Sequence, residues 1–207
     1  MRKVDQLILP MIQNEELKRA YMSVNREDFL PEKNARFAYD PEWIDKPIPL
    51  NDRVNMTALS LGIKMLDYLN LKRGERVLEV GTGSGYYTAI IAEVVGSENV
   101  TTVEVDPWVS NFASVRLSKY NIKVETTDGT IGFPKKAPYQ RAIIWAAMPT
   151  MPCLVYEQLE REGILIVPIG TQKVQNLYRI TKGDQARMER LETVIFMRAQ
   201  GLCGFYD

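Results

Sequence analysis

The sequence contains no histidine and little cysteine. Its 207 residues include two cysteines, Cys153 and Cys203, and its 26 basic side chains are matched by 26 acidic ones. Without imidazole the chain cannot form a Ser-His-Asp or Cys-His hydrolase site, a zinc site with histidine ligands, or any site with a histidine general base. Its chemistry must therefore need no imidazole.

The other scarce features narrow the cellular setting and the partners. The two cysteines lie far apart and form no C-x-x-C pair, so we expect a reduced setting and no metal site. A net charge of zero leaves no overall positive field for nucleic acid or an anionic membrane. The apolar patch near the N-terminus is short and broken by Pro10, unlike a signal peptide or a membrane span. We expect a cytoplasmic protein; nothing in the composition predicts its oligomeric state.

The length fits one domain over residues 1–207 that buries its own core. Apolar side chains repeat at helical spacing over residues 14–30, with Asn14 suited to cap the helix. Prolines, acids and weak periodicity from Pro31 to Asn55 predict an irregular covering segment. We therefore divide the domain into an N-terminal helix and covering segment, 1–56, and a cofactor-binding core, 57–207.

Strand and helix patterns alternate through the core. We predict helices over 57–69, 86–96, 107–120 and 153–163, and strands over 76–81, 100–106, 122–129, 141–147 and 164–170. The final segment, 176–197, reads as a hairpin around Lys182-Gly183-Asp184. This order indicates an α/β fold with a mainly parallel central sheet, helices on both faces and an antiparallel C-terminal end.

A glycine-rich turn, Gly81-Thr82-Gly83-Ser84-Gly85, joins the first core strand to its helix. Such a turn lets the backbone approach a ligand and directs unpaired helix N–H groups at it. The dinucleotide pattern G-x-G-x-x-G needs glycine at position 86, where this chain has Tyr86, so a nicotinamide dehydrogenase is the least favoured class. The glycines alone are also compatible with a tight turn that binds nothing.

Three acids stand at neighbouring strand ends beside this turn. Glu79 precedes the turn, where a carboxylate attracts a cationic ligand and repels a pyrophosphate. Glu104 ends the next strand, where it can accept hydrogen bonds from both ribose hydroxyls, and Asp128 follows the third strand, where it can hold the adenine amino group. We expect Tyr86 and Tyr87 to pack the helix. The predicted S-adenosylmethionine-binding residues are Glu79, Gly81, Thr82, Gly83, Gly85, Glu104, Asp128 and Gly129.

The first cofactor motif of the protein-L-isoaspartate O-methyltransferase family resembles the stretch VLEVGTGSGYYTAIIAEVVG. Similarity in order and spacing continues upstream in RAYMSVNREDFLPEKNARFAYD and downstream in TTDGTIGFPKKAPYQRAIIWAAMPTMP and EREGILIVPIG, from about residue 14 to the C-terminus. The resemblance implies a Rossmann-like class I methyltransferase fold. It also implies methyl transfer from S-adenosylmethionine to the α-carboxylate of L-isoaspartyl residues in damaged proteins and peptides, the first step of their repair.

That reaction suits a chain without histidine. A carboxylate with an ordinary pKa of about 3.5 to 4 is already a nucleophile at neutral pH and needs no general base. The enzyme must chiefly align oxygen, methyl carbon and sulfur, exclude water, and replace the hydration shell of the carboxylate with hydrogen-bond donors.

The donor segment is where the chain departs from the family. The family's substrate segment reads approximately G-x-G-x-T-I-S-x-P-H, whereas residues 51–60 read NDRVNMTALS. Thr57 falls at the serine position and keeps a hydroxyl, while Asn55 replaces the threonine and Ser60 the histidine. We expect Thr57 to orient the acceptor as the catalytic residue, with Asn55, Thr57 and Ser60 binding substrate.

The altered segment leaves several alternatives open. In one alternative, the hydroxyls of Thr57 and Ser60 donate hydrogen bonds to a carboxylate, and Arg53 adds a charge or Asn55 an amide. In another, Thr57 is only the cap of the following helix. The pocket can also serve another acceptor, or the chain can be a non-catalytic S-adenosylmethionine-binding protein. Trp145 and Met148 stand where relatives usually have smaller or more polar residues. We expect both side chains to lie near the edge of the sheet at which the methyl group is transferred. We expect Trp145 to fill space in the hydrophobic core beside its strand.

Overall fold

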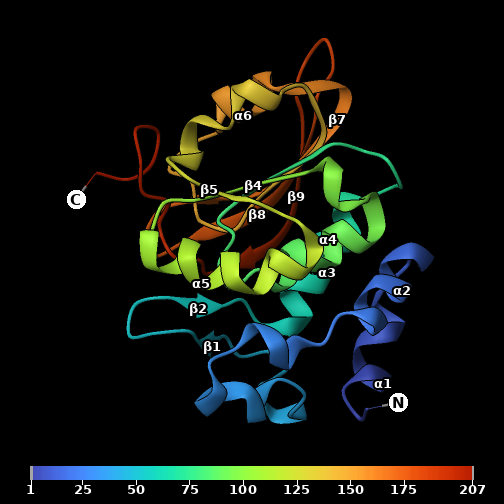
Figure 1. Ribbon diagram of the computed structural model, residues 1–207. Helices are drawn as coiled ribbons and strands as arrows, with labels where there is room; N and C mark the ends of the chain where they lie inside the picture. The colour runs from blue at the N-terminus through green and yellow to red at the C-terminus, as the bar shows by residue number, and fades with distance from the viewer. Residues whose placement is uncertain (1, 207) are drawn as a thin grey trace.

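The computed structural model describes residues 2–206, which contain a seven-stranded sheet of order β5-β4-β3-β6-β7-β8-β9 (Figure 1). Strands β3 to β7 run parallel, and β8 and β9 are antiparallel. The sheet strands are β3 (Val77–Val80), β4 (Val100–Glu104), β5 (Val124–Thr126), β6 (Tyr139–Ile144), β7 (Leu159–Gly170), β8 (Gln175–Thr181) and β9 (Arg187–Val194). The predicted α/β sheet with an antiparallel C-terminal end is confirmed.

Helices lie on both faces of the sheet (Figure 1). The α-helices are α1 (Asp5–Ile8), α2 (Glu15–Ser23), α3 (Leu59–Leu69), α4 (Tyr86–Val95), α5 (Pro107–Leu117) and α6 (Cys153–Glu157). The 3-10 helices are η1 (Leu9–Met11), η2 (Arg26–Phe29), η3 (Glu32–Phe37), η4 (Pro41–Trp43), η5 (Ser97–Asn99), η6 (Ser118–Tyr120), η7 (Gly129–Ile131) and η8 (Pro134–Lys136). Among the described residues, no helix is long and apolar enough to cross a membrane.

Alternation along the strands divides the core into two layers. Successive side chains of a strand point to opposite faces of the sheet, so Ile164 and Ile166 join the layer with α3 and α4. Leu165 and Val167 join the layer with α6. The continuous apolar run of β7 over 164–169 is therefore needed to fill both layers.

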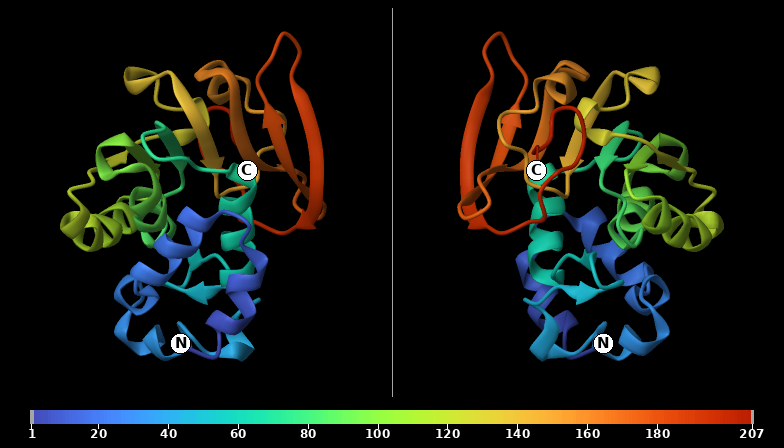
Figure 2. Two further views of the ribbon diagram at one scale, coloured as in Figure 1. Left: turned by 90° about the vertical axis from the view of Figure 1, so that its right-hand side faces the viewer. Right: turned by 90° about the vertical axis from the view of Figure 1, so that its left-hand side faces the viewer.

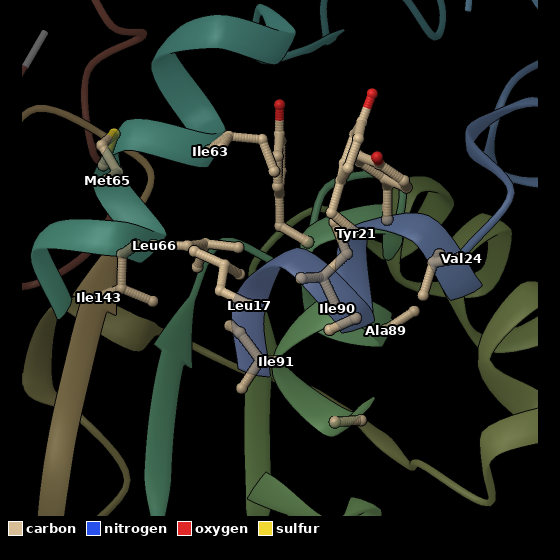
Figure 3. Packing of buried hydrophobic residues seen from close by; sticks show 14 of the residues in the cluster. Leu17, Tyr21, Val24, Ile63, Met65, Leu66, Ala89, Ile90, Ile91 and Ile143 are labelled. Atoms are coloured by element: carbon tan, nitrogen blue, oxygen red, sulfur yellow. The ribbon is translucent and has the colours of Figure 1, made fainter. Parts of the chain in front are cut away.

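The N-terminal segment packs against the α3–α4 side (Figures 1 and 2). Leu17 and Tyr21 of α2 lie in the same buried cluster as Leu66 of α3 and Ile90 of α4 (Figure 3). Asn14 caps α2, because its side chain accepts hydrogen bonds from the first-turn amides of Glu16 and Leu17, as predicted. The N-terminal segment ends in a small antiparallel hairpin, β1 (Ile48–Pro49) and β2 (Asn55–Met56). Residues 53–57 of this hairpin region lie at the carboxyl ends of the parallel strands.

Several predicted boundaries differ from the structure, and three of the differences concern helices. Helix α2 ends at Ser23 and is followed by η2, so the helix predicted over 14–30 is two elements. Helix α3 begins at Leu59, with Ala58 in the cap position, so Thr57 is not its cap. Helix α6 ends at Glu157 because Leu159 already pairs with Tyr139 of β6, and the predicted helix over 153–163 runs into β7.

Candidate active site

A cavity of about 220 Å³ opens at the carboxyl ends of the parallel strands. It lies where β4 and β6 flank β3, the point at which the strand order reverses and open α/β sheets bind their ligands. Six stretches of chain supply its lining: 53–57, 80–87 except 85 and 86, 103–106, 129–130, 145–146 and 197–200.

The glycine-rich turn forms one wall of this cavity. Gly81, Gly83 and Gly85 have φ angles of 91°, 57° and 86°, a region that side chains with a Cβ rarely adopt. The amides of Gly81 and Thr82 donate to the carbonyl of Val103 at 2.8 and 3.2 Å, which fixes the turn to β4. Gly81, Thr82 and Gly83 line the cavity as predicted, whereas Gly85 does not. Gly85 instead packs on α5, since a Cβ there would lie 3.0 Å from Cγ of Leu117.

Glu104 reaches the cavity from the end of β4. It is 8% exposed, and its two carboxylate oxygens accept from the amides of Gly83 at 3.1 Å and Asp106 at 3.0 Å. Burial raises the pKa of Glu104, and these backbone hydrogen bonds oppose the rise. Each oxygen has a further lone pair, so the carboxylate can accept hydrogen bonds from a vicinal diol.

Glu79 lies behind the turn, which corrects the expectation that it faces the incoming ligand. It is fully buried and accepts from Thr88 Oγ1 at 2.5 Å, Thr102 Oγ1 at 2.7 Å and Trp145 Nε1 at 2.9 Å. Burial raises the pKa of this carboxyl to about 7, although the three donors favour the ionised form. In its ionised form Glu79 can act on a bound cation through its charge while other residues make the contact.

Asp128 also lies outside the cavity lining, although Gly129 belongs to it. One oxygen of Asp128 accepts from the amide and hydroxyl of Thr130, at 2.8 and 2.6 Å, and the other from the amide of Leu202 at 2.8 Å. These contacts tie the C-terminal segment to the end of β5, and a contact between Asp128 and adenine stays a prediction. At Gly129, a Cβ would lie 2.5 Å from Cγ1 of Val80, so the close packing requires glycine.

The hairpin β1–β2 supplies the opposite half of the site. Asn55 and Thr57 line the cavity, and Arg53 lines it as well. The side chain of Asn51 accepts from the amides of Arg53 and Val54, both at 2.8 Å, and so shapes the loop. Within residues 2–206 the Thr57 hydroxyl makes no hydrogen bond, so it can donate to a ligand.

Ser60 is placed differently from the expectation. It is absent from the cavity lining, and its hydroxyl donates to the Asp45 carboxylate. Ser60 therefore holds the covering segment against α3, and the predicted contact with substrate finds no geometric support.

Two residues that the sequence analysis did not assign to the site hold Thr57 in place. Tyr87 lines the cavity, and its hydroxyl lies 3.0 Å from the carbonyl oxygens of both Thr57 and Ala58. Tyr86 is fully buried, which confirms the expectation that it packs the helix. For Tyr87 the same expectation was incomplete, because this residue also lines the cavity. The signal in the sequence was Gly62 on α3, where any Cβ would overlap the Tyr87 ring.

The second of these residues is Arg26, which is fully buried. Its guanidinium donates to the carbonyls of Ala38 at 3.0 Å and Thr57 at 3.4 Å, and its Nε lies 3.2 Å from Met56 Sδ. No carboxylate among the described residues pairs with it. An uncompensated positive charge beside Thr57 favours an anionic ligand in this half of the cavity.

Trp145 follows β6 directly and lines the cavity, as expected for a residue at this edge. Its ring stacks on Tyr87 with centroids 4.7 Å apart, so it also fills core. Met148 is 1% exposed within the α6 layer and does not line the cavity, so its predicted position was wrong.

Comparison with known proteins places this geometry in a family. The family model for protein-L-isoaspartate(D-aspartate) O-methyltransferase matches residues 4–202. A protein-L-isoaspartate O-methyltransferase of Methanothrix thermoacetophila is 36% identical over 198 residues, which cover 94% of this chain and 92% of that protein. One of Hyperthermus butylicus is 36% identical over 190 residues, covering 86% of this chain and 77% of the relative.

A solved structure shows the same fold. It is the crystal structure of a Plasmodium falciparum protein described as a protein-L-isoaspartate O-methyltransferase, in complex with S-adenosyl-L-homocysteine. The TM-score is 0.81 at 23% identity, with 97% of this chain and 99% of that chain covered. The match of the family model and of two relatives over most of the chain shows that this chain belongs to the protein-L-isoaspartate(D-aspartate) O-methyltransferase family.

Proposed function

We propose that the chain is an S-adenosylmethionine-dependent protein carboxyl methyltransferase that methylates the α-carboxylate of L-isoaspartyl residues in damaged proteins and peptides. The observation that carries this proposal is a single cavity with two complementary halves. The glycine-rich turn and Glu104 offer a place for an adenosyl cofactor, and the unbonded hydroxyl of Thr57 offers a donor to an acceptor. We further propose that the chain acts as one domain in the cytoplasm.

The cofactor half fits an adenosyl group. Gly81 and Gly83 leave the turn without side chains at the cavity wall, so a ligand can approach the backbone closely. Glu104 has carboxylate lone pairs free for the ribose hydroxyls. When bound, S-adenosylmethionine supplies an electrophilic methyl group on a sulfonium sulfur.

The acceptor half fits a carboxylate. An ionised α-carboxylate needs no base, so the protein has only to hold it and remove its water. Thr57 Oγ1 donates a hydrogen bond to one carboxylate oxygen, which leaves the other oxygen to attack. The charge of Arg26 offsets part of the cost of desolvating the anion, and Tyr87 and Arg26 together fix the backbone carbonyl of Thr57.

The test is transfer of a labelled methyl group to two peptides of one sequence, one with L-isoaspartate and one with L-aspartate. We expect methylation of the isoaspartyl peptide alone. Binding of S-adenosylmethionine without transfer to either peptide would refute the substrate assignment and leave the cofactor assignment standing.

A second candidate keeps the cofactor and changes the acceptor. It is favoured by Arg53 and Arg198, two cationic side chains in the cavity lining. Arg53 comes from the diverged 51–60 segment, and its guanidinium lies 3.5 Å from the Asp106 carboxylate. An acceptor screen over other carboxylates distinguishes the candidates, because methylation confined to isoaspartyl peptides excludes the second. Methyl transfer of either kind excludes a non-catalytic binding protein.

A further inference from the structure

The indole of Trp145 is held in the cavity by two contacts that do not depend on a ligand. Its Nε1–H donates to Glu79 Oε1 at 2.9 Å, and its ring stacks on the Tyr87 ring at an interplanar angle of 23°. Glu79 is in turn fixed by two threonine hydroxyls, and Tyr87 by the carbonyls of Thr57 and Ala58. The indole is therefore a rigid part of the cavity wall.

The sheet order shows which part of a cofactor lies nearest this indole. Glu104 ends β4 and Trp145 follows β6, with β3 between them, so about 10 Å separates the two strand ends. Ribose at Glu104 has the adenine on one side and the sulfonium-bearing carbon on the other. Gly129 and Thr130 follow β5, beyond β4, and offer small side chains to the adenine. A sulfonium joined to that ribose would then lie over β3, on the side of β6.

The position of the acceptor leads to the same placement. Methyl transfer brings the sulfonium within reach of the acceptor held at Thr57, and Thr57 is joined to Trp145 through Tyr87. The carboxylates among the described lining residues are Glu104, assigned to ribose, and Asp106, paired with Arg53. Glu79 is buried behind the wall, so the cavity is lined here by the aromatic side chain of Tyr87 from α4 and by Trp145 and the small Ala146, which follow β6.

We propose that Trp145 is a positioning residue that holds the sulfonium of the methyl donor by a cation–π contact, with its N–H anchored on Glu79. This inference rests on the proposed cofactor and deepens it. Indole is the strongest of the aromatic side chains for such contacts, and donation of its N–H to a carboxylate enriches the ring in electron density. The contact is present with S-adenosylmethionine and absent with S-adenosylhomocysteine, whose sulfur is neutral. Trp145 therefore favours the charged methyl donor over the spent product.

The test measures the dissociation constants of both compounds by calorimetry, without any peptide, for the parent chain and for Trp145→Phe and Trp145→Leu. The selectivity is the dissociation constant of S-adenosylhomocysteine divided by that of S-adenosylmethionine. We expect Trp145→Leu to lower this ratio by between about twofold and thirtyfold, with Trp145→Phe between leucine and the parent. Trp43→Phe is the matched control, since Trp43 stacks on Phe37 away from the cavity and should leave the ratio unchanged.

Two outcomes overturn the inference. An unchanged ratio, whether both compounds bind equally more weakly or as they do to the parent, would show that Trp145 does not act on the charge of the sulfur. A raised ratio would reverse its role. Retained binding of S-adenosylhomocysteine shows that a variant is folded. If the parent binds neither compound, the proposed function fails first, whereas a parent that binds both with variants of unchanged ratio refutes this inference alone.

Discussion

The two halves of the cavity are built by different means. The cofactor half rests on backbone geometry: positive φ angles at Gly81 and Gly83, and amides that fix the turn to β4 and Glu104 to the turn. The acceptor half rests on side chains from distant parts of the chain, since Arg26 and Tyr87 hold the carbonyl of Thr57. A site set by backbone geometry tolerates little change, whereas one set by side chains can diverge while the fold persists. The same contrast is expected from the sequence, in which the 51–60 segment departs from the family's pattern and the turn keeps it.

The largest expected effect concerns the buried charge beneath the cofactor half. The pKa of Glu79 is about 7 in the folded chain against an ordinary value of 4.5, so the folded state binds the proton more tightly. The stability that protonated Glu79 contributes is fully present below pH 4.5 and is lost as the pH rises through 7. This loss lowers the free energy of unfolding by about 3 kcal/mol. Urea unfolding at pH 5 and pH 8 measures it.

The matched variant for this prediction is Glu79→Gln, which keeps the shape and removes the titration. We expect it to lose less stability than the parent between pH 5 and pH 8. Part of the dependence should remain, because burial also raises the pKa of Glu104. Identical pH dependence in parent and variant would show that Glu79 does not titrate in this range.

The next prediction tests the cofactor half of the cavity by the binding of S-adenosylmethionine. Glu104→Ala removes both acceptors for a ribose diol, and hydrogen bonds to a charged group contribute about 1.5 to 3 kcal/mol each. We expect the dissociation constant of S-adenosylmethionine to rise about 100-fold or more, as measured by calorimetry. Glu98→Ala, at the exposed middle residue of η5, is the control and should bind as the parent does. Unchanged binding by Glu104→Ala would remove the basis of the cofactor assignment.

Thr57 tests the acceptor half without touching the other. We expect Thr57→Val to lower kcat/KM for an isoaspartyl peptide about 10-fold to 100-fold, the value of a hydrogen bond to a charged oxygen, while the dissociation constant of S-adenosylmethionine stays constant. Thr57→Ser restores the hydroxyl and should recover most of the activity. Valine and serine variants of equal activity would show that the hydroxyl has no part in the reaction.

The smallest effect concerns Arg53. This side chain is 75% exposed and pairs with Asp106, so an exposed charge of this kind should contribute modestly. We expect Arg53→Gln to raise KM for the peptide about threefold at low salt, with the difference disappearing at 0.5 M salt because screening weakens the attraction. A loss of more than 30-fold at both salt concentrations would indicate direct recognition by Arg53 and favour the second candidate acceptor.

Local patterns predicted much of the fold. Alternating strand and helix periods led to the parallel sheet, and the cap at Asn14 and the turn at Gly81 depend on residues a few positions apart. The end of α6 was missed because the four-residue spacing of Val155 and Leu159 suits a helix, while the pairing of Leu159 with Tyr139 is a tertiary contact. Helical spacing alone cannot exclude a strand that a distant partner stabilises.

The same limit applies to the site. Glu104 and the glycines were found because strand ends bring them together, whereas Arg26 stands in a polar stretch, N-R-E-D, that reads as exposed. Its burial depends on Ala38 and Met56, which the sequence does not connect to it. The position of Ser60 was predicted wrongly because its hydrogen-bond partner, Asp45, lies in the irregular segment, which the sequence does not connect to α3. Strand-end topology placed Glu104 correctly, but it also predicted Glu79 and Asp128, which lie outside the cavity lining. The prediction therefore failed where packing decides which way a side chain faces.

The most direct test of the two-half site is labelled methyl transfer by the parent chain to matched isoaspartyl and aspartyl peptides. It requires both halves to act on one substrate in a single assay. The structure and the family lead us to expect methylation of the isoaspartyl peptide and none of the aspartyl peptide. Saturable binding of S-adenosylmethionine with no methylation of the isoaspartyl peptide would contradict the account, because the acceptor half would then serve a different substrate.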